Sequence, residues 1–267
     1  MADTTPTAGS VTSNLRLAPG TFTPDTRRAS VPAMVAAQAR IESRLFLRHG
    51  EQQLLSLVIP LLTLVALSLT SVIDVADPIR VAFPLTLAIS AMSSGFTGQA
   101  IAVAFDRRYG ALKRIGASGV PPWTIISGKV VAVIAVAAVQ TLILTVTALL
   151  LGWRPDSALG VVYALLTLLV GVAAFTALGL LVGGTLPAEI VLALANLIWF
   201  LLVGFSSYVV VRAAGDIHPA LNVVPSVALA DGVKDALAGQ LPLTHLAILL
   251  VWMVLGGAAA AKLFRFE

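Results

Sequence analysis

The amino-acid sequence predicts an all-α, polytopic membrane protein with six transmembrane helices, an N-terminal amphipathic interfacial helix and short external helices between spans five and six. Hydrophobic residues make up 58% of the chain and charged residues 11%, whereas a soluble domain usually carries about 25% charged residues. The mean hydropathy is +0.96. Apolar runs of about 20 residues, the length that crosses a bilayer, recur along the chain. The predicted spans are Leu54–Ile73, Val81–Phe105, Ile125–Leu151, Ala158–Gly183, Ile190–Val211 and Leu243–Ala261.

The first 30 residues differ in composition from the rest. They are rich in Thr, Ser, Pro and Ala and show no sustained apolar period, so we expect a disordered cytoplasmic tail over residues 1–30. No apolar core follows a basic start in this stretch, which argues against a signal peptide. Residues 31–267 are then expected to form one transmembrane domain.

An amphipathic helix is predicted to begin near Val31. Apolar residues recur there at three- and four-residue steps, and Arg40, Arg44 and Arg48 form a second stripe at four-residue steps. Such a helix can lie in the headgroup layer with its arginines reaching lipid phosphates. The alternative is a helix that packs on protein, because its apolar face is modest.

The basic residues indicate the orientation of the spans. Of the 17 Lys and Arg residues, 13 fall on the side of the N-terminus when six spans are assigned. The four on the other side are Arg80, Arg154, Arg212 and Lys234. We therefore expect a multi-pass protein of the cell inner or plasma membrane. By the positive-inside rule, both of its termini are expected on the cytoplasmic side.

A charged island separates the second and third predicted spans. If Asp106–Ala117 is helical, Tyr109, Leu112 and Gly116 share one face, and Arg107 and Arg114 share the opposite face with their guanidinium groups outward. Gly119 would end this helix. The island is then a candidate docking segment. The alternative is a plain basic loop that follows the positive-inside rule.

The long connection between spans five and six is predicted to carry a short helix outside the membrane. Ser226 can cap it, Gly239 can stop it, and Leu229, Val233 and Leu237 lie on one face. The helix is too short to span, so its apolar face must dip into the membrane or pack on the bundle. These three residues are candidates for an outer gate.

Polar and small residues within the spans have two readings. Gln99, Gln140 and Asn196 can each hydrogen-bond a neighbouring helix or contact cargo, and Gln99 and Asn196 are the candidates for a cargo path. Gly179 and Gly183 lie four residues apart, a spacing that permits close approach between helices.

Several chemistries have no support in the sequence. The chain has no cysteine, which excludes thiolate metal sites and thiol catalysis, and its three histidines, His49, His218 and His245, have no acidic partner at metal-ligand spacing. Gly128-Lys129 is followed by Val130, so it does not complete a phosphate-binding loop. We therefore expect a non-enzymatic protein with no directly bound cofactor or metal. The basic residues lie beside apolar spans, which argues against a nucleic-acid partner.

The order of these features resembles the permease subunits of ABC-2 type exporters. Their motif between spans two and three has counterparts in Asp106, Arg107, Gly110, Leu112, Lys113, Arg114, Ala117, Pro121, Gly128 and Lys129. Their proline-to-glycine segment in the last external loop has counterparts in Pro225, Leu229, Gly232 and Gly239. The resemblance covers about residues 31–265.

The resemblance implies a half-transporter that pairs with a second, identical or homologous permease subunit among membrane lipids. A separate ABC ATPase, carrying ATP and magnesium, would dock on the basic segment and drive export of a hydrophobic drug, a lipid or a glycan. The implied coupling residues are Asp106, Arg107, Arg108, Tyr109, Gly110, Leu112, Lys113 and Arg114. A membrane scaffold or assembly protein, and an ion-coupled secondary carrier, are the alternative functions.

Overall fold

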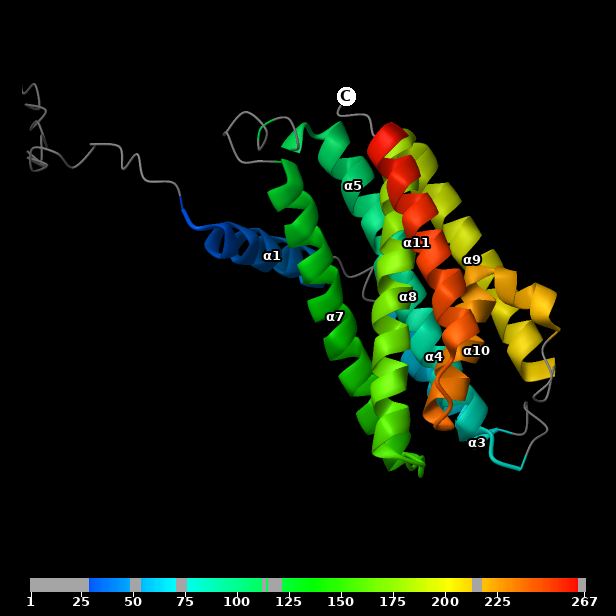
Figure 1. Ribbon diagram of the computed structural model, residues 1–267. Coiled ribbons are helices and arrows are strands. Elements are labelled where there is room, and N and C mark those ends of the chain that lie inside the picture. The colour runs from blue at the N-terminus through cyan, green and yellow to red at the C-terminus, as the bar shows by residue number, and fades with distance from the viewer. Residues whose placement is uncertain are drawn as a thin grey trace, which may run out of the picture. The chain divides into compact units, whose positions relative to one another are not determined.

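The computed structural model describes residues 29–48, 54–70, 76–111, 114, 122–212 and 218–263. The chain divides into two units, Met1–Ser30 and Val31–Glu267, and the second carries the helices described below. Its described residues contain helices and no strand, which confirms the predicted all-α class (Figure 1). The predicted disordered tail lies almost entirely outside the described residues and stays a prediction.

Five helical segments in the described part of the chain are long and apolar enough to cross a membrane. The first is continuous and consists of α4 (Ile79–Met92), the π-helical turn η2 (Ser93–Thr97) and α5 (Gly98–Arg108). The others contain α7 (Pro122–Leu150), α8 (Ala158–Thr185), α9 (Ala188–Arg212) and α11 (Leu243–Leu263). The predicted first span corresponds to η1 (Leu54–Val58) and α3 (Ile59–Leu69), where the apolar helix Ser56–Leu69 is shorter than the other five. The sixth crossing therefore stays a prediction.

The α4–η2–α5 segment lies at the centre of the bundle. Its apolar window is 89% buried, and its elements contact α3, α7, α8, α9 and α10. The segment approaches α8 closely, because a Cβ added at Gly179 would lie 2.6 Å from the carbonyl oxygen of Phe96. A Cβ at Gly183 would overlap the carbonyl oxygen of Ala100. The predicted close approach through these two glycines is confirmed. Because glycine has no side chain, the backbone of α8 packs directly against the backbone of the central segment.

Gln140 joins three helical segments inside the bundle. Its Nε2 donates to Ser56 Oγ at 2.9 Å, and Ser90 Oγ donates to Gln140 Oε1 at 3.1 Å. Ser90 Oγ also lies 2.7 Å from the carbonyl oxygen of Ser56. Each of these groups is buried, so the bonds offset the cost of removing the side chains from water. Gln140 therefore hydrogen-bonds neighbouring helices, which is the packing role predicted for it.

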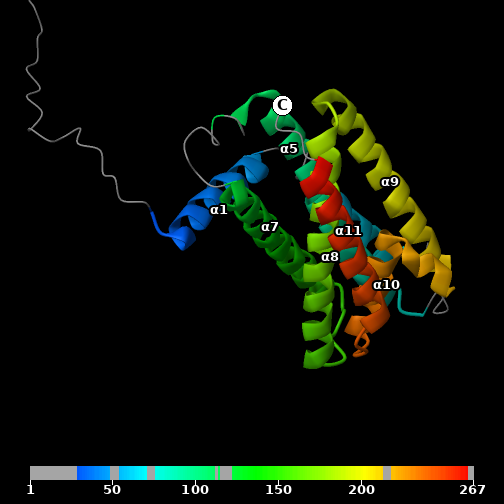
Figure 2. The ribbon, with the colours of Figure 1, turned by 45° about the horizontal axis from the view of Figure 1, so that its top comes forward.

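The N-terminal helix α1 (Val31–Arg48) lies across α7 (Figures 1 and 2). The contact is tight at Gly128, where an added Cβ would overlap the side chain of Gln38. Arg40, Arg44 and Arg48 are exposed along α1. The predicted helix is thus present and packs on protein through one face, while its location in the headgroup layer stays a prediction.

Two short helices connect α9 to α11, namely η3 (Pro219–Val223) and α10 (Pro225–Leu237). Leu229 and Val233 are fully buried, and Leu237 packs against the core. The predicted docking of this apolar face on the bundle is confirmed, since α10 contacts α4, α8, α9 and α11.

The two predicted ends of the α10 helix have different outcomes. Gly239 has a φ of 86°, a left-handed conformation that ends a helix and favours glycine, as predicted. The prediction that Ser226 caps the helix is wrong. Val224 holds the N-cap position, and Ser226 Oγ is buried with no hydrogen-bond partner among the described residues.

Candidate functional site

The candidate coupling residues begin in the last turn of α5. This helix ends at Arg108, and Gly110 has a φ of 65°. A new helical bond follows, because the Arg114 backbone N–H donates to the Gly110 carbonyl at 3.1 Å. The prediction of one continuous helix over Asp106–Ala117 is therefore wrong. The left-handed conformation, which glycine adopts without steric cost, turns the chain at this point.

Asp106 belongs to a group of three charges around the buried Lys129, which we call the lysine lock: Asp106, Lys129 and Glu42. Lys129 Nζ lies 2.7 Å from Asp106 Oδ2 and 2.8 Å from Glu42 Oε1, and its side chain is only 4% exposed. The three residues come from α5, α7 and α1. A buried ammonium is costly without partners, so the lock ties these three helices together at one end of the bundle.

Arg107 points toward α8 rather than outward as predicted. Its guanidinium donates to the carbonyl oxygens of Gly183 at 3.0 Å and Leu186 at 3.2 Å. The last carbonyls of a helix have no partner within that helix and carry partial negative charge, which explains why the cation binds there. Arg107 thus fastens the end of α5 to the end of α8. The neighbouring Arg108 forms an ion pair with Glu189 at the start of α9.

The outward surface of the site is formed by Tyr109 and Arg114. Tyr109 is 64% exposed and stacks on Phe105 with ring centroids 5.9 Å apart, and Arg114 is also exposed. An open pocket of about 390 Å³ lies between the end of α5 and the connection from α8 to α9. It is lined by Ala104, Arg107, Arg108, Gly110, Leu186, Pro187, Ala188 and Glu189. Leu112 and Lys113, the remaining predicted coupling residues, lie outside the described residues.

The two candidate cargo residues are Gln99 of α5 and Asn196 of α9. Gln99 is buried, and its Oε1 has no hydrogen-bond partner within the described ranges. Asn196 donates from Nδ2 to the Leu192 carbonyl at 2.9 Å, which leaves its Oδ1 without a described partner. A cargo path through these residues stays a prediction.

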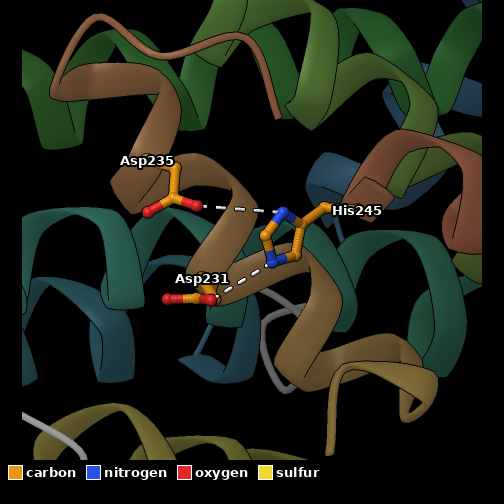
Figure 3. Close-up of side chains that lie close together, drawn as sticks. All are labelled: Asp231, Asp235 and His245. Atoms are coloured by element: carbon orange, nitrogen blue, oxygen red, sulfur yellow. Dashed lines mark hydrogen bonds and ion pairs between the residues drawn. The ribbon is translucent and has the colours of Figure 1, made fainter. Parts of the chain in front are cut away.

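A second charged cluster lies where α10 meets the start of α11 (Figure 3). His245 Nε2 lies 3.1 Å from Asp231 Oδ2, and Lys234 Nζ donates to Asp231 Oδ1 at 2.8 Å. Burial opposes ionisation of Asp231, but the hydrogen bonds from His245 and Lys234 outweigh it and lower its pKa. Burial and the charge of Asp231 raise the pKa of Asp235. The expectation that the histidines have no acidic partner is wrong for His245, because the turn after α10 brings together residues that are 14 positions apart.

These features define a polytopic helical membrane protein with a charged lock at the end of its most buried span and a buried helix before its last span. Residues 67–263 match the family model described as ABC-2 family transporter protein. The chain therefore belongs to the ABC-2 family of transporter proteins, whose members are membrane permeases of ABC transporters. No curated protein matched the chain, and no solved structure matched it.

Proposed function

We propose that this chain is the permease subunit of an ATP-driven exporter that moves a hydrophobic drug, a lipid or a glycan out of the cytoplasm. ATP and magnesium are bound by a separate ABC ATPase, and a second permease subunit, identical or homologous, completes the pathway. The protein lies in the cell inner or plasma membrane, with both termini on the cytoplasmic side. Family membership supports a permease with a partner ATPase in general.

The observation that carries the coupling proposal is the position of the lysine lock beside an exposed turn. Tyr109 and Arg114 follow directly after α5 and offer an aromatic ring and a guanidinium to a partner. Asp106, three residues before Tyr109, is held by Lys129 of α7 and, through it, by Glu42 of α1. Separating buried paired charges is costly, so a displacement of the turn moves the ends of three helices together.

Arg107 and Arg108 extend the same connection to the other side of the bundle. Arg107 binds the end of α8 and Arg108 pairs with Glu189 of α9. We assign Arg107 to positioning α5 against α8, and the exposed groups of Tyr109 and Arg114 to contact with the ATPase. An acidic or carbonyl-lined cleft is a suitable acceptor, because hydrogen bonds from a guanidinium to such groups are charge-assisted.

The opposite end of the transport path is assigned to α10. Leu229 and Val233 are fully buried there, and Leu237 lies on the same helix. An outer gate needs an apolar seal that can separate from its neighbours, and these side chains pack between α10 and the spans around it. The export direction and the position of α10 outside the membrane follow from the proposed orientation.

The test compares Tyr109→Ala/Arg114→Glu with the control Lys262→Glu. Lys262 is also exposed and lies near the end of α11, at the same end of the bundle as the end of α5 (Figure 1). The double variant should insert normally yet lose copurification with the ATPase and stimulation of its hydrolysis. The control should retain both. Equal ATPase binding and efflux in the two variants would refute the coupling assignment, and ATPase binding without any ATP-dependent efflux by the wild type would indicate a scaffold.

A further inference from the structure

We propose that His245 and Asp235 bind a divalent transition-metal ion of the zinc class, with Asp231 as the carboxylate that orients the histidine. This metal site would connect α10 to the first turn of α11. The inference stands on the geometry of the cluster. It rests on the proposed function only for its consequence, which is that the metal would hold the outer-gate helix closed against the last span.

The first argument comes from the tautomer of His245. Its Nε2 faces Asp231 Oδ2 at 3.1 Å, and an ionised carboxylate can only accept a hydrogen bond. A neutral imidazole therefore carries its proton on Nε2, and the lone pair is on Nδ1. Histidines that bind metals usually donate their other ring N–H to a carboxylate or carbonyl in this way.

The second argument is the unused nitrogen. His245 Nδ1 lies 3.9 Å from Asp235 Oδ2, which is too long for a hydrogen bond, and within the described residues it makes none. Figure 3 shows Nδ1 directed at the Asp235 carboxylate. Zinc sites in proteins have metal–nitrogen and metal–oxygen distances of about 2.0–2.2 Å, so a shift of a few tenths of an ångström brings both atoms into coordination. The His245 side chain is only 9% exposed, so this nitrogen has little access to water as a substitute partner.

The charges around the cluster are compatible with a cation. Lys234 Nζ forms an ion pair with Asp231, 2.8 Å from its Oδ1, which is the oxygen that does not face the histidine. Asp235 has no such partner at hydrogen-bond distance among the described residues, and it lies on the same helix face as Asp231, where two like charges repel. A metal ion at Asp235 relieves this repulsion. The Asp235 side chain is 33% exposed, which leaves room for water as the remaining ligands.

The backbone holds the histidine in place between the two carboxylates. A Cβ added at Gly232 would lie 2.8 Å from His245 Cβ and 3.3 Å from a methyl carbon of Thr167. Glycine at this position lets α11 and α8 approach α10 closely, so that the imidazole lies beside the turn that carries Asp231 and Asp235. Imidazole with carboxylate and water is a ligand set that suits zinc and related metals, whereas calcium and magnesium prefer oxygen alone.

The test uses the purified full-length chain without any ATPase, freed of metal by a chelator and then titrated with Zn²⁺. Binding is followed by calorimetry, and thermal unfolding by the fluorescence of its 4 tryptophans. The wild type should bind zinc and unfold at a higher temperature when zinc is present. His245→Gln and Asp235→Asn should lose both effects, and Asp231→Asn should weaken zinc binding by about 10–100-fold. The control His218→Gln, which changes an exposed histidine before η3, should respond as the wild type does.

The outcomes separate this proposal from its alternatives. Zinc binding that is equal in the wild type, His245→Gln and Asp235→Asn would overturn it, as would a wild type without any zinc response. A wild type whose stability depends on protonation of the imidazole but not on zinc would assign the cluster to a proton instead. Should His245→Gln fail to fold, Asp235→Asn at its partly exposed position decides the result. Because no ATPase is present, neither result bears on ATPase coupling.

Discussion

Replacement of Lys129 by methionine tests the lysine lock most directly. The change removes the charge but keeps a long side chain, so Asp106 and Glu42 lose their shared cation while the space stays filled. Loss of one partner from a buried ion pair costs about 3–5 kcal/mol, because the remaining charge is buried without compensation. Asp106 is 30% exposed and Glu42 15% exposed, so water screens part of this charge. We therefore expect the lower end of that range, about 3 kcal/mol, for Lys129→Met.

A neutral lock provides the matched comparison. In the triple variant Glu42→Gln/Asp106→Asn/Lys129→Met, no uncompensated charge remains, so the main cost of Lys129→Met is removed. We expect the triple variant to recover most of the stability lost in Lys129→Met, but not the ATP-dependent efflux, because the charge pairs between the three helices are gone. Stability is measured by urea unfolding in detergent, and efflux in vesicles that contain the ATPase. Wild-type stability of Lys129→Met would refute the lock as a structural element, and full efflux by the triple variant would refute its role in coupling.

Three further predictions concern the packing of α8, the burial of α10 and the N-terminal tail. Gly183→Ala should destabilise the protein by about 1–3 kcal/mol, because the new methyl group overlaps the Ala100 carbonyl. The control Gly257→Ala places its methyl group in open space and should leave the stability unchanged. Thermal unfolding of the two variants gives the comparison. Val233→Asp should lose a few kcal/mol of stability and most efflux, because the new carboxylate would be fully buried. Val223→Asp, at an exposed position, is its control. Unchanged unfolding and efflux in Val233→Asp would show that α10 does not form a seal. Removal of residues 1–30 should leave efflux at matched expression nearly unchanged, since their composition gives them no core to join, and a loss of most efflux would assign a function to the tail.

The features that follow from local periodicity could be predicted from the sequence. The apolar runs predicted the spans, the four-residue spacing of Gly179 and Gly183 predicted close approach, and the stripe on α10 predicted burial of Leu229 and Val233. Each of these depends on residues within one helix. The length of an apolar run, however, does not determine the length of the helix that it forms. The apolar helix Ser56–Leu69 is shorter than the predicted first span.

The contacts between helices could not be predicted in this way. Lys129 lies 23 residues from Asp106 and 87 from Glu42 along the chain, and no spacing rule relates positions so far apart. Helical periodicity also placed Arg107 on an outward face, because a single helix carries no information about the free carbonyls at the end of α8. Gly110 illustrates the same limit. Glycine is compatible with both a helix and a left-handed turn, and the tertiary contacts on either side of it decide between them.

The central segment connects the two parts of the proposed mechanism. At one end, α5 carries Asp106 of the lock and Arg107, which binds the end of α8. At the other end, α4 contacts α10, and α8 contacts both α10 and α11. Between them, Ser93–Thr97 forms a π-helical turn, a local departure from α-helical bonding that is frequent at functional sites. In the proposed mechanism, a displacement of the lock reaches α10 along this buried segment. A metal ion between α10 and α11 would then raise the energy needed to separate these two helices at the proposed outer gate.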